Sequence, residues 1–450
     1  MAGESRALAR FVAELDFAHL PDNVVNYAKL CVLDLLASAV PGSNTEPVNM
    51  MFDVVAGPGG REEATIIARG TKAPCLAAAL VNGAMAHAVE MDDVHRGAII
   101  HPAAPIIPAA LAVAEREGAD GKTLLTAVVA GYDVAIRLGE CVGRTHYQFW
   151  HTTGTCGTFG AAAAASKILG LDEERTLDAL GNAGDQASGL WQFLKDGAMS
   201  KVLHTGKAAF DGVLAALLAQ KGFTGAKEII EGEAGFCRAT SRDYDLSKLT
   251  DGLGERFKIA EVSLKPYASC RFTHAPIDAI LALRAKHDLD LDRVKRIEVE
   301  THSQAVRIAG NPEPKTPYEA KFSIHYCLAV ALLRGKVGLR EFTPELLADE
   351  RVRRLMRCVE VSVDPEIDAQ FPVKWPARVR VALDDGTTYE ELVEYPLGDP
   401  ENPMSFEGVK AKFLDLAKGI MSEEDVEAVA ALVGRLEKLS DITELMELLM

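Results

Sequence analysis

Apolar residues recur at helical spacing through the first two-thirds of the chain, in stretches rich in alanine. Alanine is the best helix former, and apolar positions three and four apart line one face of a helix. Short glycine-containing breaks separate the stretches. The pattern predicts helices over residues 24–40, 73–90, 105–116, 122–141, 158–169 and 208–220. We therefore expect a large all-helical domain over residues 1–268.

Further along the chain the period of the pattern changes from helical to alternating. Apolar and polar residues alternate, as in half-buried strands, over residues 296–301, 359–363, 378–383 and 387–393. The turn Asp384-Asp385-Gly386 between the last two runs predicts a β-hairpin. Helical patterns at 275–287 and 322–334 accompany the runs. These features predict a smaller α+β lid domain over residues 269–396.

The C-terminal residues return to the helical pattern. Apolar residues at three-four spacing predict helices over 405–418 and 423–436. We expect residues 397–450 to rejoin the helical domain. A chain of 450 residues is too long for one ordinary core. The predicted fold is thus mainly α with an α+β part.

The charge balance and the cysteines exclude several classes of protein. The chain has 65 acidic against 48 basic side chains, a net charge of −17, and no basic run, which argues against nucleic-acid or anionic-membrane partners. No uncharged stretch of membrane-spanning length has suitable flanks, and residues 1–17 resemble an amphipathic helix rather than a signal peptide. The eight cysteines are scattered, as buried hydrophobic residues are, without a zinc or disulfide pattern. We expect a cytoplasmic protein.

One short segment concentrates groups that can move protons. Three carboxylates and three imidazoles lie within residues 87–101, namely His87, Glu90, Asp92, Asp93, His95 and His101. Histidine transfers protons near neutral pH, and a neighbouring carboxylate can orient it. Two alternatives stay open. The acids can cap the next helix or coat a surface, or His87, Asp92, Asp93 and His95 can bind a divalent metal.

Two further segments combine cationic side chains with a helix. His151 precedes glycines spaced by three at 154–160, and the exposed N–H groups of a helix start favour anions. The same glycines can equally serve close helix packing. Lys201 and His204 are three residues apart, so they can share one helical face and suit a carboxylate. The alternative is a solvated lysine and a structural histidine.

Cationic side chains also mark the proposed domain boundary. Lys265, Arg271 and His274 lie within ten residues there, and clefts between domains are favoured ligand sites. Arginine can bind a carboxylate with two parallel hydrogen bonds. A polar linker is the alternative. Tyr326, at a predicted helix start, can donate to a substrate oxygen or be an ordinary core tyrosine.

In this order, the five segments resemble the MmgE/PrpD family over almost the whole chain. The matching motifs are the paired acids before His101-Pro102, His151 before GxxGxxGAAAAA, Ser200-Lys201-x-x-His204-x-Gly206, Lys265-Pro266-Tyr267 to Thr273-His274, and Ala320-Lys321-Phe322-Ser323-x-x-Tyr326. The resemblance implies a helical domain with an α+β lid, an active site between the two domains, a homodimer, and no metal or organic cofactor.

The resemblance also implies roles for the acid and histidine segment. His101 becomes the leading candidate for proton transfer at carbon. Asp92 or Asp93 would orient the site, and Tyr326 would close it. These are expectations carried over by matching position.

Further roles follow for the cationic side chains. His151 and Lys201 would act at the reacting centre, as carboxylate binders or secondary acid/base groups. The remaining substrate-binding candidates are His204, Lys265, Arg271 and His274. Cationic groups of this kind would stabilise the negative charge that develops on a carboxylate when a neighbouring proton is added or removed.

Members of the family catalyse several reactions on small polycarboxylates: dehydration of 2-methylcitrate, decarboxylation of cis-aconitate, and epimerisation of iminodisuccinate. The five motifs together, with the frequency of 2-methylcitrate dehydratase in the family, lead us to expect a hydro-lyase of that kind. Val94 follows the paired acids where the decarboxylase branch carries a threonine, which argues against the decarboxylase activity. Decarboxylation and epimerisation are the alternatives within the family. A metal-dependent hydrolase built on His87, Asp92, Asp93 and His95 is the alternative from another class.

Overall fold

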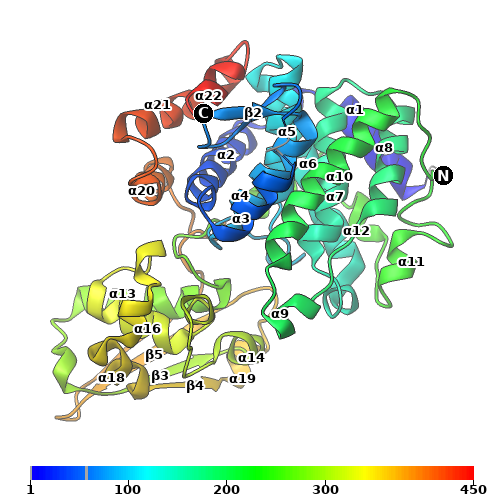
Figure 1. Ribbon diagram of the computed structural model, residues 1–450. Coiled ribbons are helices and arrows are strands. Elements are labelled where there is room, and N and C mark those ends of the chain that lie inside the picture. Colours follow the sequence, from blue (N-terminus) through cyan, green and yellow to red (C-terminus); the bar gives the residue numbers. More distant parts are fainter. Residues whose placement is uncertain (1–2, 56–58) are drawn as a thin grey trace. The chain divides into compact units, whose positions relative to one another are not determined.

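Two units make up the chain in this computed structural model, which describes residues 3–55 and 59–450. Unit 1 comprises Met1–Ser263 and Ser405–Met450, and unit 2 comprises Leu264–Met404. The chain therefore leaves unit 1 after Ser263 and returns to it at Ser405. Figure 1 traces the elements of each unit in chain order.

Unit 1 is built from helices, with one short hairpin. Its elements are α1 (Glu4–Glu14), α2 (Asp22–Gly42), α3 (Glu46–Val55), β1 (Ala64–Ile66), β2 (Thr71–Ala73), α4 (Cys75–Ala88), α5 (Ala103–Glu117), α6 (Gly121–Tyr147), α7 (Thr152–Ile168), α8 (Glu173–Gln186), α9 (Gln192–Asp196), α10 (Ser200–Gln220), α11 (Phe236–Thr240), α12 (Ser247–Thr250), α20 (Phe406–Ala417), α21 (Glu423–Gly434) and α22 (Thr443–Glu447). Single 3-10 turns are η1 (Phe17–His19), η2 (Lys258–Glu261) and η6 (Leu436–Lys438).

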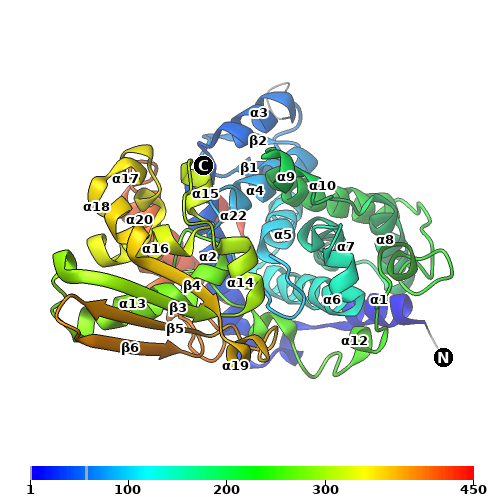
Figure 2. The ribbon, with the colours of Figure 1, turned by 90° about the horizontal axis from the view of Figure 1, so that it is seen from below.

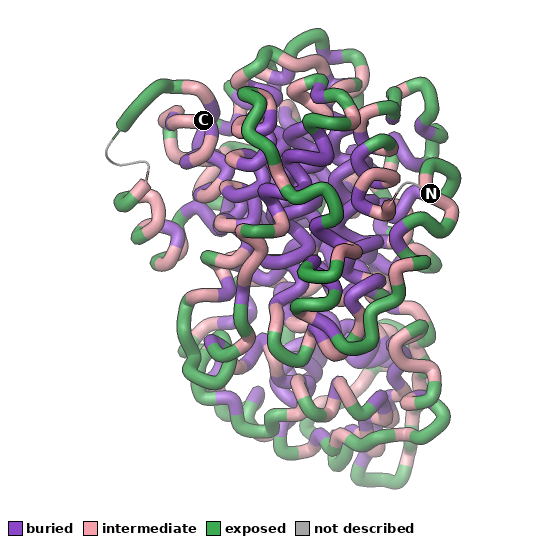
Figure 3. The backbone as a smooth tube through the Cα atoms, turned by 90° about the vertical axis from the view of Figure 1, so that its right-hand side faces the viewer, coloured by how far each residue is buried: buried purple, intermediate pink, exposed green. Residues whose placement is uncertain are grey.

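Helix α7 forms the centre of unit 1 and packs against α5, α6, α8 and α10. Its small residues allow this, because the helix is buried from Thr152 to Ser166. At Gly160 an added Cβ would lie 2.7 Å from Ala135 Cβ and 2.7 Å from Gly131 O, both on α6. Figure 3 shows the resulting distribution, with buried stretches inside and exposed stretches outside.

Unit 2 combines a mixed sheet with helices (Figure 2). Its elements are η3 (Arg271–Thr273), α13 (His274–Lys286), η4 (Leu291–Arg293), β3 (Val294–Thr301), α14 (Ser303–Ala309), α15 (Pro317–Ala320), α16 (Ile324–Arg334), η5 (Leu339–Glu341), α17 (Pro344–Ala348), α18 (Glu350–Cys358), β4 (Val359–Val363), α19 (Pro365–Asp368), β5 (Ala377–Leu383) and β6 (Thr388–Val393). The strand order is β4-β3-β5-β6, with β3 parallel to β4 and antiparallel to β5.

The observed elements confirm the predicted fold class, a mainly α protein with an α+β part. The hairpin between β5 and β6 is confirmed as well, with Gly386 at φ +87° in the turn. Two helix starts were wrong. The helix predicted over residues 208–220 begins at Ser200. The helix predicted over residues 158–169 begins at Thr152, because the glycines at 154–160 are accommodated by close packing and do not break the helix.

Two helices have the length and apolar composition of a membrane span, which the sequence analysis did not identify. They are α2 and α10. The most apolar 18-residue window of α2 is 83% buried within the structure, and that of α10 is 56% buried. Core helices pass the same test, so this finding is weak evidence for a membrane segment. The absence of a membrane partner stays a prediction.

Candidate active site

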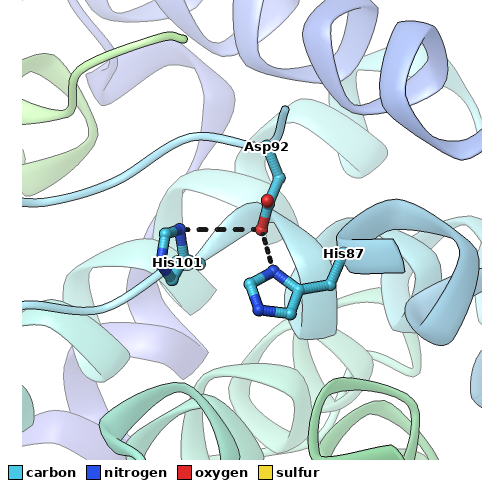
Figure 4. Close-up of side chains that lie close together, drawn as sticks. All are labelled: His87, Asp92 and His101. Carbon is cyan, nitrogen blue, oxygen red and sulfur yellow. Dashed lines mark hydrogen bonds and ion pairs between the residues drawn. The ribbon is translucent and has the colours of Figure 1, made fainter. Parts of the chain in front are cut away.

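The end of α4 places an aspartate against a histidine of the same helix. After Ala88 the chain turns at Glu90, whose φ of +62° lies in the left-handed region that non-glycine residues seldom adopt. The turn brings Asp92 back toward the last helical turn. Oδ2 of Asp92 lies 2.6 Å from Nδ1 of His87, and both side chains are fully buried (Figure 4). A backbone strain of this kind costs about 1–3 kcal/mol and is typical of functional sites.

His101 lies on the other side of Asp92, at the end of the same loop. Its Nδ1 is 2.6 Å from the main-chain oxygen of Asp93 and 3.7 Å from Oδ2 of Asp92 (Figure 4). A carbonyl oxygen can only accept, so Nδ1 of His101 carries a proton and donates it. Nε2 is then the ring nitrogen of His101 that this bond does not engage. The rings of His87 and His101 are 4.9 Å apart between centroids.

The two adjacent acids have different environments. Asp93 is fully buried and accepts from Ala103 N at 3.0 Å and from the hydroxyl of Tyr132 at 2.8 Å. Burial raises the pKa of Asp93 well above its ordinary value. Asp93 thus fastens the loop to α5 and α6, whereas Asp92 contacts the histidines. Of the two, Asp92 is the one that this geometry places for orienting an imidazole.

A second pair of histidines adjoins the first. Nδ1 of His151, directly before α7, is 3.3 Å from Nδ1 of His204 on α10, and the ring of His151 is 5.9 Å from that of His87. Burial, followed by the neighbouring His87, lowers the pKa of His151 well below its ordinary value and that of His204 to about 4. Both rings are therefore neutral near pH 7, and one Nδ1–H donates to the other nitrogen.

An ion pair and aromatic rings complete the cluster in unit 1. The ammonium of Lys201 pairs with the carboxylate of Glu90, and both side chains are largely buried. The ring of Trp191 is 4.9 Å from His151, and Phe193 is 5.4 Å from His204. Helix α10 carries Lys201 and His204 at its start, as their spacing predicted.

The remaining predicted site residues lie in unit 2. Around the start of α13, Lys265 and His274 are buried, and Arg271 forms an ion pair with Asp399. Nε and Nη1 of Arg271 have no hydrogen-bond partner among the residues that the structure describes. The hydroxyl of Tyr326 is buried and donates to the main-chain oxygen of Glu341 at 2.6 Å. That bond fits a structural role for Tyr326 within unit 2.

The contacts that two residues of the cluster make, His87 and Glu90, were not predicted from the sequence. His87 was predicted as one of several proton-transferring groups or as a metal ligand, without a link to Asp92, although its spacing of five from Asp92 across a helix end is the signal that links them. Glu90 was not connected with Lys201, because 111 residues separate them. Within the described part of the chain, Nε2 of His87 has no hydrogen-bond partner.

The metal set proposed from the sequence is not assembled as proposed. His87, Asp92 and His101 have donor atoms within 4.8 Å of one another, whereas Asp93 bonds to Tyr132. His95 belongs to a different group, with Glu140 and Glu261. The ammonium of Lys258 lies 2.9 Å from Glu140 and 3.1 Å from Glu261, where it compensates part of their negative charge. His87, Asp92, Asp93 and His95 therefore do not form one metal site.

Comparison with known proteins places the whole chain in one family. The model of the MmgE/PrpD N-terminal domain matches residues 6–249, and that of the MmgE/PrpD C-terminal domain matches residues 267–438. A cis-aconitate decarboxylase of Aspergillus terreus (strain NIH 2624 / FGSC A1156) is 30% identical over 100% of this chain and 96% of its own length.

Two further relatives extend the comparison. The human cis-aconitate decarboxylase is 28% identical over 99% of this chain and 94% of its own length. The mitochondrial 2-methylcitrate dehydratase of Yarrowia lipolytica is 24% identical over 90% of this chain and 82% of its own length. With family models matching both parts of the sequence and relatives aligned from end to end, the chain belongs to the MmgE/PrpD family.

Proposed function

We propose that this protein is a lyase that removes a carboxylate from a small unsaturated polycarboxylate such as cis-aconitate. The observation that carries the proposal is the arrangement of His87 and His101 around Asp92, close to His151 and the ion-paired Lys201. The cluster combines proton-transferring imidazoles with a cation, the two functions that a carbon–carbon lyase of carboxylates needs.

The proposal reverses the order of reactions that the sequence analysis favoured. Val94 was given weight against decarboxylation, yet decarboxylases align with the full chain at 28–30% identity, and the dehydratase at 24%. Val94 is buried and pairs with Ser263 through main-chain bonds of 2.8 Å in both directions. Main-chain anchoring of this kind does not depend on whether a threonine or a valine stands there.

The geometry supports different roles for His101 and for Lys201 during decarboxylation. When the bond between carbon and carboxylate breaks, its electron pair stays on the substrate and must be taken up by a proton. In this proposal His101 delivers that proton from Nε2. Its support is that Nδ1 of His101 donates to the main-chain oxygen of Asp93 and lies beside Asp92. Lys201, with the neutral His151 and His204 as hydrogen-bond partners, would hold the carboxylates that remain.

Dehydration is the second candidate. The 2-methylcitrate dehydratase of Yarrowia lipolytica aligns with 90% of this chain. The same imidazoles could remove a proton next to a carboxylate and protonate the departing hydroxide. The two reactions share the site and differ in the leaving group.

A product analysis in deuterium oxide tests the proposal. Purified protein would be incubated with cis-aconitate or 2-methylcitrate and followed by proton NMR. We expect carbon dioxide release from cis-aconitate and one deuterium in the remaining dicarboxylate. In His101→Asn, the amide can still donate to Asp93 but cannot transfer a proton, so the rate should fall about 100-fold or more. His19→Asn, at an exposed histidine outside the cluster, is the control.

The outcomes separate the candidates. Loss of water from 2-methylcitrate, with cis-aconitate unchanged, would establish the dehydratase. No conversion of either compound at high enzyme concentration would refute both reactions. Full activity in His101→Asn would refute the assigned role of His101.

A further inference from the structure

A lysine from the C-terminal segment reaches the loop that carries Asp92. Helix α20 follows the return of the chain to unit 1 and packs against α2. Its Lys412 donates to Oδ1 of Asp34 on α2 at 2.6 Å and to the main-chain oxygen of Met91 at 2.7 Å. The side chains of Lys412 and Asp34 are 5% and 1% exposed, so both bonds are made away from water.

We propose that Lys412 is a positioning residue for Asp92, and thereby for the two histidines that Asp92 contacts. Met91 directly precedes Asp92 and directly follows Glu90, whose backbone has the left-handed conformation. Lys412 binds the carbonyl of Met91, which lies between the turn at Glu90 and the carboxylate of Asp92. The loop is therefore fixed at the residue where a small rotation of the chain would move the carboxylate away from Nδ1 of His87. This proposal rests on the proposed function for its catalytic consequence.

The charges around the loop support the same role. Asp34, Asp92 and Asp93 lie close enough for the charges of Asp92 and Asp34 both to raise the pKa of Asp93, in addition to the larger effect of burial. The ammonium of Lys412 lies within this acidic group. A positive charge there offsets part of the negative charge that the carboxylates place around the loop.

A buried ion pair can also be merely structural, and the chain offers a matched control. Lys29 on α2 lies 2.5 Å from Oε2 of Glu437 and 3.3 Å from the main-chain oxygen of Gly434, and its side chain is 8% exposed. Like Lys412, Lys29 bonds to one carboxylate and one carbonyl, and like Lys412 it connects α2 with the C-terminal segment. Its partners are remote in sequence from the catalytic loop. Lys29→Met therefore reproduces the loss of such a link without releasing Met91.

The experiment compares Lys412→Met, Lys412→Arg and Lys29→Met in the full chain. Each variant is assayed for kcat and KM on cis-aconitate across pH. Each is also examined for the downfield proton resonance of the short His87–Asp92 hydrogen bond, assigned by its loss in His87→Gln. We expect kcat of Lys412→Met to fall roughly 100-fold, the loss that a misplacement of about 1 Å can cause. KM should change little, the pH profile and the resonance should shift, and Lys412→Arg should restore part of kcat.

Several results would overturn the proposal. They are equal losses of kcat in Lys412→Met and Lys29→Met, or an unchanged resonance and pH profile in Lys412→Met. If Lys412→Met does not fold, the double variant Asp34→Asn/Lys412→Met removes the uncompensated carboxylate and takes its place in the comparison. If the wild-type protein does not convert cis-aconitate, the proposed function fails. The resonance, which needs no substrate, then decides the positioning role alone.

Discussion

Glu90 combines two properties that are usually found in different residues. It ends α4 in the left-handed conformation that glycine normally supplies, and its side chain neutralises the buried ammonium of Lys201. A glycine would make the same turn with less strain but would leave Lys201 without this carboxylate. Under the proposed function, the identity of residue 90 would therefore govern how strongly Lys201 attracts an anionic substrate.

Removing the charge of Glu90 tests this consequence. In Glu90→Gln the turn and a hydrogen bond to Lys201 can persist, but the ammonium is no longer compensated. We expect KM for a tricarboxylate to fall by roughly tenfold, which corresponds to about 1.4 kcal/mol. Asp211→Asn, which removes the partner of Lys207 further along α10, is the matched control. A higher KM in Glu90→Gln would show that the carboxylate orients Lys201 and does not compete with substrate.

Individual residues were predictable where the chemistry is local in sequence. Asp92 and His101 could be identified because carboxylates and imidazoles are concentrated within residues 87–101. The pairs Lys201–Glu90 and Lys412–Asp34 could not, because 111 and 378 residues separate their members. Spacing along the chain carries no information on contacts that depend on tertiary packing.

At the scale of elements, α7 shows how one sequence pattern supports two interpretations. The glycines after His151 fitted either an anion-binding helix start or close packing. Added Cβ atoms at Gly154 and Gly157 would lie 2.6 Å from Ser188 O and from Pro105 Cγ, and Gly160 touches α6. Close packing is thus a role that the structure demonstrates. It also explains why the helix begins before residue 158.

Two glycines of this region should differ in how much stability their substitution costs. Gly160→Ala should destabilise the protein by about 1–3 kcal/mol, because α6 leaves no space for a methyl group. Gly170, just after the same helix, has φ +62° and open space around it, so Gly170→Asn should cost much less. Denaturant unfolding of both variants measures the difference. Equal stability of Gly160→Ala and wild type would show that α6 and α7 can separate at no cost.

For the whole molecule, buried neutral histidines link stability to pH. Burial lowers the pKa to about 4 for His146, His204, His302 and His325. These residues come from both units. In the unfolded chain a histidine has a pKa near 6.5. Below that pH these histidines become protonated in the unfolded state but stay neutral in the folded state. The free energy of unfolding should therefore decrease from about pH 6.5 toward pH 4.

His146 offers a test of this dependence outside the catalytic cluster. Its Nε2 bonds to Thr155 at 2.8 Å, a contact that His146→Gln can retain. We expect the variant to lose less stability than wild type between pH 7 and pH 5, with a difference approaching about 2 kcal/mol. Chemical denaturation at the two pH values measures it, with His19→Gln as an exposed control. An unchanged pH dependence would mean that His146 is protonated in the folded state.

The family and the mixture of helical and α+β parts were also predictable at this scale, because both rest on patterns that extend over many residues. The order of reactions was not. Val94 counted against decarboxylation in the sequence, although in the structure its main chain is what anchors the loop. Selectivity between leaving groups depends on atomic positions within the site, which no pattern of residue types specifies.

The return of the chain to unit 1 also has a consequence during synthesis. Asp34 and the carbonyl of Met91 acquire Lys412 only when α20 has left the ribosome, and Lys412 lies 378 residues after Asp34. At about 5–20 residues per second this interval is roughly 20 to 75 s. During this time α20 cannot yet cover α2, so nascent chains expose a face of α2 that the complete protein buries and on which chaperones can act.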